Sequence, residues 1–96
     1  MKTREDILDL LLKNKANLQT RYQVTKIALF GSFARGDHSS NSDVDILIEV
    51  PASIGLRFVT LAQELQNILQ MKVDLVSTRA LKKNIRDIIQ NEALYV

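Results

Sequence analysis

The hydrophobic and polar positions of this 96-residue chain follow two different periods in turn. Short runs rich in β-branched and apolar residues, typical of strands, cover residues 24–30, 43–50 and 72–76. Before, between and after these runs, apolar residues recur at three- and four-residue steps, as on one face of an α-helix. The predicted order is helix, strand, loop, strand, helix, strand, helix, which is an α/β (α+β) arrangement.

Start signals mark the predicted helices. Thr3, with Asp6 three residues later, is typical of a helix N-terminus. The second long helical pattern begins at Ile54, and Ser77 or Thr78 can cap the last helix. We expect two neighbouring apolar stripes of the first helix to lie in the core: Ile7, Leu11 and Leu18 in one, and Leu8 and Leu12 in the other.

Length and composition indicate one globular domain over residues 1–96. Charged residues make up 25% and hydrophobic residues 46% of the chain, which argues against disorder. The net charge is only +2, and segment 21–50 carries three basic and four acidic residues. We therefore expect no direct binding of nucleic acid. The sequence has no cysteine, no signal-peptide pattern and no apolar stretch that could span a membrane, so we expect a cytoplasmic protein.

The most informative stretch begins where the first predicted strand ends. Gly31 allows a sharp turn and close approach of a ligand to the backbone, and Ser32 would open a short helix. The free N–H groups at such a helix start favour a phosphate. This turn is followed, after a polar loop, by Asp43 and Asp45 at the start of the second predicted strand.

Asp43 and Asp45 are two residues apart, so in a strand both side chains leave the same face. Their Cβ atoms would lie roughly 6–7 Å apart, close enough to bind divalent cations jointly. Asp74, between Val73 and Leu75 in the third predicted strand, is a third carboxylate for the same sheet face. Three such groups would repel one another without a metal, and some would have raised pKa values.

The short connection from Phe30 to Asp43 limits the topology. A parallel crossover usually needs a dozen or more residues and a full helix, but this connection already holds a glycine turn and a polar loop. If Ser32 and Asp43 serve one ligand, the first strand ends beside the start of the second. We therefore expect an antiparallel pair within a mixed sheet of three or four strands, flanked by helices.

This pattern resembles the nucleotidyltransferases of the DNA polymerase β superfamily. The shared features are Gly31-Ser32, ten intervening residues, Asp43-x-Asp45 and a later strand carrying Asp74. Small size, the continuation Ala34-Arg35-Gly36 and the ending 88–95 are similar to its minimal nucleotidyltransferase (MNT) branch, and the resemblance covers nearly the whole chain. Many members of that branch are antitoxins encoded beside a helical HEPN ribonuclease toxin, and the better understood ones transfer AMP from ATP to a toxin tyrosine.

The resemblance implies a polymerase-β-like nucleotidyltransferase fold and a set of roles. Asp43, Asp45 and Asp74 would be the catalytic carboxylates and the ligands of Mg²⁺, with two ions expected. Gly31 and Ser32 would hold the triphosphate of ATP, and Arg35 and Ser42 are further candidates for phosphate contacts. Larger relatives carry an added helical domain that presents the acceptor, so we expect the acceptor hydroxyl to come from another protein, a HEPN-type toxin.

Two other functions stay open from the residues alone. The domain could be a non-catalytic antitoxin that occludes its partner, or a nucleotidyltransferase acting on a small aminoglycoside-like molecule. Outside the motif, we interpret His38 as a solvated residue of the polar loop, because no second histidine or cysteine accompanies it.

Overall fold

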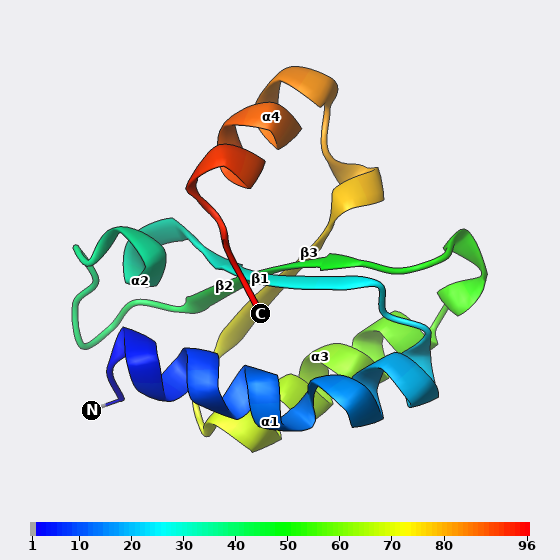
Figure 1. The fold of residues 1–96 in the computed structure, drawn as a ribbon, viewed down its shortest axis with the longest axis horizontal. Coiled ribbons are helices and arrows are strands. Elements are labelled where there is room, and N and C mark those ends of the chain that lie inside the picture. Colours follow the sequence, from blue (N-terminus) through cyan, green and yellow to red (C-terminus); the bar gives the residue numbers. More distant parts are fainter. Residues whose placement is uncertain (1) are drawn as a thin grey trace.

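The predicted order of elements is present in the computed structural model, which describes residues 2–96. Figure 1 shows the ribbon, and its labels are used from here on. The helices are α1 (Arg4–Tyr22), α2 (Gly31–Arg35), α3 (Arg57–Leu69) and α4 (Lys83–Glu92), with short 3-10 turns at Ala52–Ile54 and Thr78–Ala80. The strands are β1 (Lys26–Phe30), β2 (Val44–Glu49), β3 (Val73–Ser77) and β4 (Leu94–Tyr95).

The four strands form one mixed sheet in the order β3-β2-β1-β4. β1 pairs antiparallel with β2 and with β4, whereas β2 and β3 are parallel. The expected mixed sheet and the expected antiparallel pairing of the first two strands are therefore confirmed.

The core lies between one face of the sheet and the helices α1 and α3, which run side by side beneath it in Figure 1. Val44, Ile46 and Ile48 point into this core because every second side chain of β2 leaves the same face. α4 stands on the opposite side of the sheet, and none of its residues is buried. The face on which α4 stands is covered only in part: Ala28 and Leu47 are buried there, whereas Asp43 and Asp74 at the strand ends are exposed.

The start of α1 is as predicted. Thr3 and Asp6 form a capping box, in which each side chain accepts a hydrogen bond from the backbone N–H of the other. Of the two apolar stripes, Ile7, Leu11 and Leu18 are buried, whereas Leu12 is 58% exposed. The expectation that the second stripe lies in the core was wrong at Leu12, because the layer of α3 and the sheet covers only one side of α1.

Two helix starts differ from the prediction. The second helix does not begin at Ile54: a 3-10 turn ends there, and Gly55, with φ of +55°, breaks the chain direction before α3 starts at Arg57. Ser77 does act as a cap, but its side chain accepts from Arg79 N–H and caps the 3-10 turn rather than α4. Cap-type residues mark a helix start locally and do not specify whether the helix continues.

None of the helices within residues 2–96 is both long and apolar enough to cross a lipid bilayer.

Candidate active site

The candidate site lies at the edge of the sheet where β1 ends and β2 and β3 begin. In the register of the sheet, Phe30 at the end of β1 pairs with Asp45, and Asp45 pairs with Asp74 of β3. Gly31 follows Phe30 directly, and Asp43 precedes β2 directly. The topology therefore brings together Gly31, Asp43, Asp45 and Asp74, as the sequence predicted.

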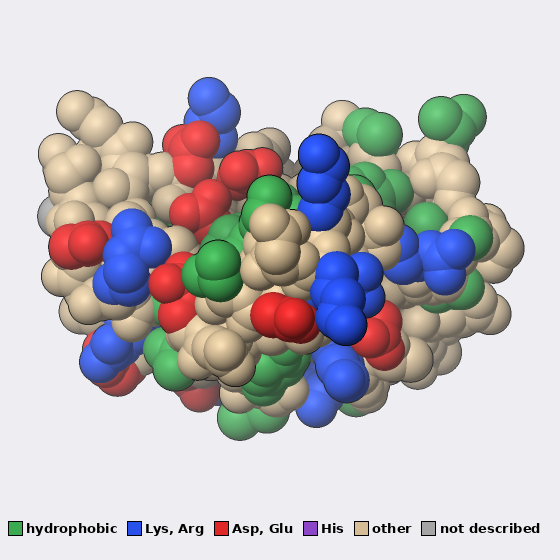
Figure 2. All heavy atoms as spheres, turned by 90° about the horizontal axis from the view of Figure 1, so that it is seen from above, with side chains coloured by type: hydrophobic (Ala, Val, Ile, Leu, Met, Phe, Trp, Pro, Cys, Tyr) green, Lys and Arg blue, Asp and Glu red, His purple; other side chains and the backbone are tan. Residues whose placement is uncertain are grey.

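Asp45 and Asp74 lie on the face of the sheet opposite to α1 and α3, and Asp43, which directly precedes β2, is close enough for its charge to act on Asp45. Val44 and Ile46 on either side of Asp45 point into the core, so Asp45 points to the side on which α4 stands. Figure 2 views the molecule from this side and shows acidic side chains gathered over the half that holds α2. The site is thus open to a ligand from the face that α1 and α3 do not cover.

Asp45 is the carboxylate with the most perturbed protonation. Burial raises its pKa to about 6, with further contributions from the charge of Asp74, a hydrogen bond to Asp74 and the charge of Asp43. Arg35 acts in the opposite direction and lowers the pKa of Asp45. A half-buried acid among like charges is stabilised when a proton or a cation neutralises it.

Gly31 lies in close contact with this carboxylate. An added Cβ at Gly31 would come within 2.1 Å of Asp45 Oδ2, and Gly31 has φ of +74°. Both observations require glycine, because other residues rarely adopt this backbone conformation and no side chain fits the space. The turn after β1 is therefore built so that the backbone lies directly against Asp45.

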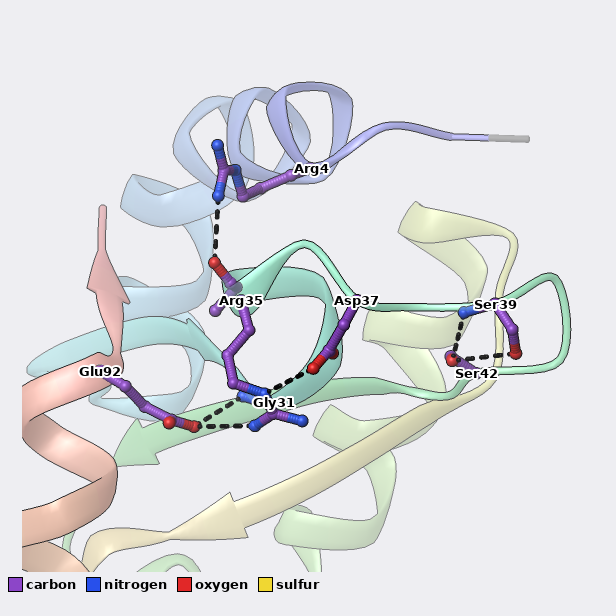
Figure 3. A network of polar contacts seen from close by, with 8 residues as sticks. Arg4, Gly31, Arg35, Asp37, Ser39, Ser42 and Glu92 are labelled. Carbon is purple, nitrogen blue, oxygen red and sulfur yellow. Dashed lines mark hydrogen bonds and ion pairs between the residues drawn. The ribbon is translucent and has the colours of Figure 1, made fainter.

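α2 is fixed at its C-terminal end by specific contacts. Gly36 ends it in the left-handed conformation, with its N–H donating to Ser32 O, and Arg4 of α1 donates from Nη1 to Ala34 O over 3.0 Å. Ser32 is half-buried in the first turn, where backbone N–H groups have no partner within the helix. Figure 3 shows Arg4 reaching α2 from the far side of the site.

Arg35 lies between two acids. Its Nε donates to Asp37 Oδ2 over 3.1 Å, and its Nη1 lies 3.4 Å from Glu92 Oε1 of α4. The same Glu92 oxygen accepts from Gly31 N–H over 3.3 Å. In Figure 3 both dashed lines converge on this oxygen. No local signal in the sequence indicates a chemical role for Glu92, which lies within the ending 88–95 that resembles the MNT branch.

Ser42 belongs to the loop before β2, and its hydroxyl is used within that loop. Ser39 N–H donates to Ser42 Oγ over 2.8 Å, which closes a tight turn just ahead of Asp43. Ser42 thus lies next to the carboxylates in the chain, and its hydroxyl faces Ser39 (Figure 3).

His38 is not the solvated loop residue that the sequence suggested. Its ring stacks on Phe33 of α2, with ring centroids 4.0 Å apart and planes within 11°. The histidine is therefore half-buried and helps to hold the polar loop against α2.

The donor set suits Mg²⁺ in combination with phosphate oxygens. Among residues 2–96, no three or more His, Cys, Asp or Glu side chains are arranged to hold a metal ion by themselves. Mg²⁺ usually takes one or two carboxylates together with water and substrate phosphates rather than an all-protein cage. The neighbouring carboxylates Asp45 and Asp74, with the raised pKa of Asp45, meet this requirement.

Comparison with known proteins identifies the family to which this chain belongs. The model of the nucleotidyltransferase domain family matches residues 12–96. The protein adenylyltransferase MntA of Thermococcus cleftensis is 38% identical over 99 residues, covering all of this chain and 98% of the relative. Both sequences therefore correspond from end to end.

Solved structures share the fold. A minimal nucleotidyltransferase structure superposes with a TM-score of 0.74 at 30% identity, covering 92% of this chain and 93% of that one. A toxin-antitoxin structure containing AMP-PNP superposes with a TM-score of 0.65 at 26% identity, covering 98% of this chain and 72% of that one. These proteins thus share the fold of this chain, and the chain belongs to the nucleotidyltransferase domain family.

Proposed function

We propose that this protein is a Mg²⁺-dependent protein adenylyltransferase that moves AMP from ATP to a hydroxyl group of a HEPN-type toxin, most readily a tyrosine, and so acts as its antitoxin. The observation that carries the proposal is the pairing of Asp45 with Asp74 directly against the Gly31 backbone. The similarity to the MntA adenylyltransferase and to a toxin-antitoxin structure containing AMP-PNP supports the choice of an adenine nucleotide and of a toxin as the partner.

In this proposal the turn after β1 binds the triphosphate. The N–H groups at the start of α2, the hydroxyl of Ser32 and the guanidinium of Arg35 donate to phosphate oxygens. Ser42 is a further candidate donor, provided that its hydroxyl leaves Ser39. Because α2 is held by Arg4 and Gly36, these donors are positioned before the ligand arrives.

The carboxylates Asp43, Asp45 and Asp74 would hold two Mg²⁺ ions together with the phosphates. Bound there, the ions would neutralise phosphate charge and lower the pKa of the attacking hydroxyl. Asp74 accepts the proton of that hydroxyl. The hydroxyl oxygen then forms a bond to the α-phosphorus, the bond between that phosphorus and the oxygen bridging to the β-phosphate breaks, and pyrophosphate leaves in line.

The test is intact mass spectrometry of the protein mixed with a HEPN-type partner encoded beside it, ATP and Mg²⁺. The expected result is a partner mass increased by one or more AMP units. The double variant Asp43→Asn plus Asp45→Asn should abolish the increase. A matched control, Asp9→Asn plus Asp87→Asn, removes two exposed acids outside the site and should leave the increase intact.

A different outcome would favour the occlusion function. If the wild-type protein and the Asp43→Asn plus Asp45→Asn variant both co-purify tightly with the partner and both neutralise it, with no mass change, catalysis is not the basis of neutralisation. The proposed transferase activity toward that partner would then be wrong.

A further inference from the structure

The carboxylate of Glu92 lies on donors that the proposed function assigns to a nucleotide phosphate. One oxygen, Oε1, accepts from Gly31 N–H over 3.3 Å and lies 3.4 Å from Arg35 Nη1. Glu92 is the last residue of α4 and lies sixty-one positions after Gly31 in the chain. Figure 3 shows its side chain extended from the end of α4 toward both groups.

Glu92 is poorly placed for its own helix. The C-terminal end of a helix carries partial negative charge, so an acid in the last turn is destabilising, and α4 has no basic residue there to compensate. The contact with Gly31 and Arg35 offsets this cost, because a backbone N–H and a guanidinium N–H both lie within hydrogen-bonding distance of the carboxylate. A residue that breaks the local rule for its own helix while satisfying a distant group is a candidate for a functional contact.

The contact is also weak enough to be exchanged. Both distances are at the long end for hydrogen bonds, and the Glu92 side chain is 32% exposed. Arg35 keeps a second, shorter partner in Asp37, so it remains oriented if Glu92 leaves. A carboxylate and a phosphate oxygen require the same donors and repel each other, so both cannot occupy the site.

We propose that Glu92 stands in for a phosphate oxygen in the nucleotide-free protein, and that nucleotide binding displaces it and thereby loosens the end of α4. This inference rests on the proposed nucleotide-binding function. Few other contacts hold α4 itself, which has no buried residue. The segment after α4 is held more firmly: β4 pairs with β1, the N–H of Val96 donates to Ile27 O over 3.1 Å, and the side chains of Leu94 and Val96 pack against the core. Occupancy of the nucleotide site is therefore coupled to the position of α4.

The test measures the affinity for ATP with Mg²⁺ by titration calorimetry in three proteins: wild type, Glu92→Gln and Asp87→Asn. Glu92→Gln removes the competing charge and should tighten binding by about three- to tenfold. Asp87→Asn removes an equal charge from an exposed position on the same helix and should change the affinity less than twofold. Melting curves identify any variant that is not folded, and Glu92→Ala serves as the second variant at this position.

Hydrogen exchange gives a readout that a purely electrostatic effect would not change. In wild type, ATP with Mg²⁺ should speed amide exchange over residues 89–95, whereas Glu92→Gln should show fast exchange there already without nucleotide. Two results would overturn this inference alone, provided that the wild type binds ATP. One is that Glu92→Gln binds ATP no more tightly than the wild type, and the other is that ATP does not change amide exchange over residues 89–95 of the wild type. Absence of ATP binding by all three proteins would overturn the proposed function and this inference with it.

Discussion

At the scale of single residues, Asp45 links the fold to the chemistry. It lies in the middle of the sheet edge, with Gly31 on one side and Asp74 on the other, and burial raises its pKa to about 6. Without a cation this arrangement costs stability, because the folded state holds an acid in a place that disfavours its charge. The position is therefore better explained by ligand binding than by stability of the domain.

The raised pKa of Asp45 predicts a specific pH dependence of folding. Its usual value is 3.8, so between about pH 4 and pH 6 the folded state binds more protons at this site than the unfolded state does. The stability contributed by this protonation is present at low pH and is lost as the pH rises through 6. We expect the free energy of unfolding of wild type, relative to Asp45→Asn, to fall by about 1 kcal/mol between pH 5 and pH 7.5.

Urea unfolding of both proteins in metal-free buffer at the two pH values measures this difference. Other carboxylates also titrate in this range, and subtracting the Asp45→Asn variant removes their contribution. A difference that stays constant, or that grows as the pH rises, would show that the pKa of Asp45 is not raised in the folded protein.

Gly31 provides a second test at the residue scale. Gly31→Ala should lower the free energy of unfolding by about 2–4 kcal/mol, because it adds a left-handed backbone penalty and a clash with Asp45 Oδ2. Gly36→Ala is the matched control, since Gly36 also has positive φ but nothing lies within 4 Å of its added Cβ. It should cost only the backbone penalty, about 1–2 kcal/mol. Equal losses for both variants would contradict the close approach at Gly31.

At the scale of elements, the covered face of the sheet carries the stability. Leu65 of α3 is fully buried, and Val59 of the same helix is 58% exposed. Leu65→Ala should lower the free energy of unfolding by about 2–5 kcal/mol, whereas Val59→Ala should change it by less than about 0.5 kcal/mol. Denaturant titrations of the two variants provide the measurement, and similar losses would mean that α3 does not pack as the structure shows.

The sequence predicted the elements where local signals and burial agree. The short link from Phe30 predicted that β1 is antiparallel to β2, and the structure confirms this pairing. Alternation in the second strand also predicted that Asp45 points away from the core, and the core positions of Val44 and Ile46 agree with it. The start of α1 was also predictable, because its capping box uses residues three positions apart. These features depend on neighbours in the chain, which is why the pattern of residues indicates them.

Other features of the fold and the site depend on contacts between residues that no local pattern in the sequence indicates. The start of α4 was missed because Ser77 caps a 3-10 turn instead, and no periodicity separates such a turn from a longer helix. Glu92 was missed as a site residue because its contact with Gly31 spans sixty-one positions. His38 was assigned to solvent because nothing local shows that its ring stacks on Phe33.

At the scale of the whole molecule, the net charge of +2 conceals an uneven distribution. Asp43, Asp45 and Asp74 meet at one edge of the sheet, and Glu92 lies against Gly31, where the proposed function places the phosphates. ATP, itself strongly negative, is repelled by this edge unless cations come with it. Under the proposed function, we therefore expect the metal-bound nucleotide to be the ligand, and we do not expect a basic surface to steer the nucleotide to this edge.

This charge distribution predicts that nucleotide and metal stabilise the domain only together. At a concentration one hundred times its dissociation constant, a ligand that binds the folded state adds about 2.7 kcal/mol to stability. For a chain of this size, that corresponds to a rise in melting temperature of roughly 10 °C or more. We expect this rise with ATP plus Mg²⁺, little change with ATP plus EDTA, and only a small rise with Mg²⁺ alone.

Thermal melts of wild type beside the Asp43→Asn plus Asp45→Asn variant test the coupling, because the variant should lose the rise with ATP plus Mg²⁺. An equal rise for ATP in EDTA would place the nucleotide away from the three carboxylates, since bare triphosphate has no favourable contact with them.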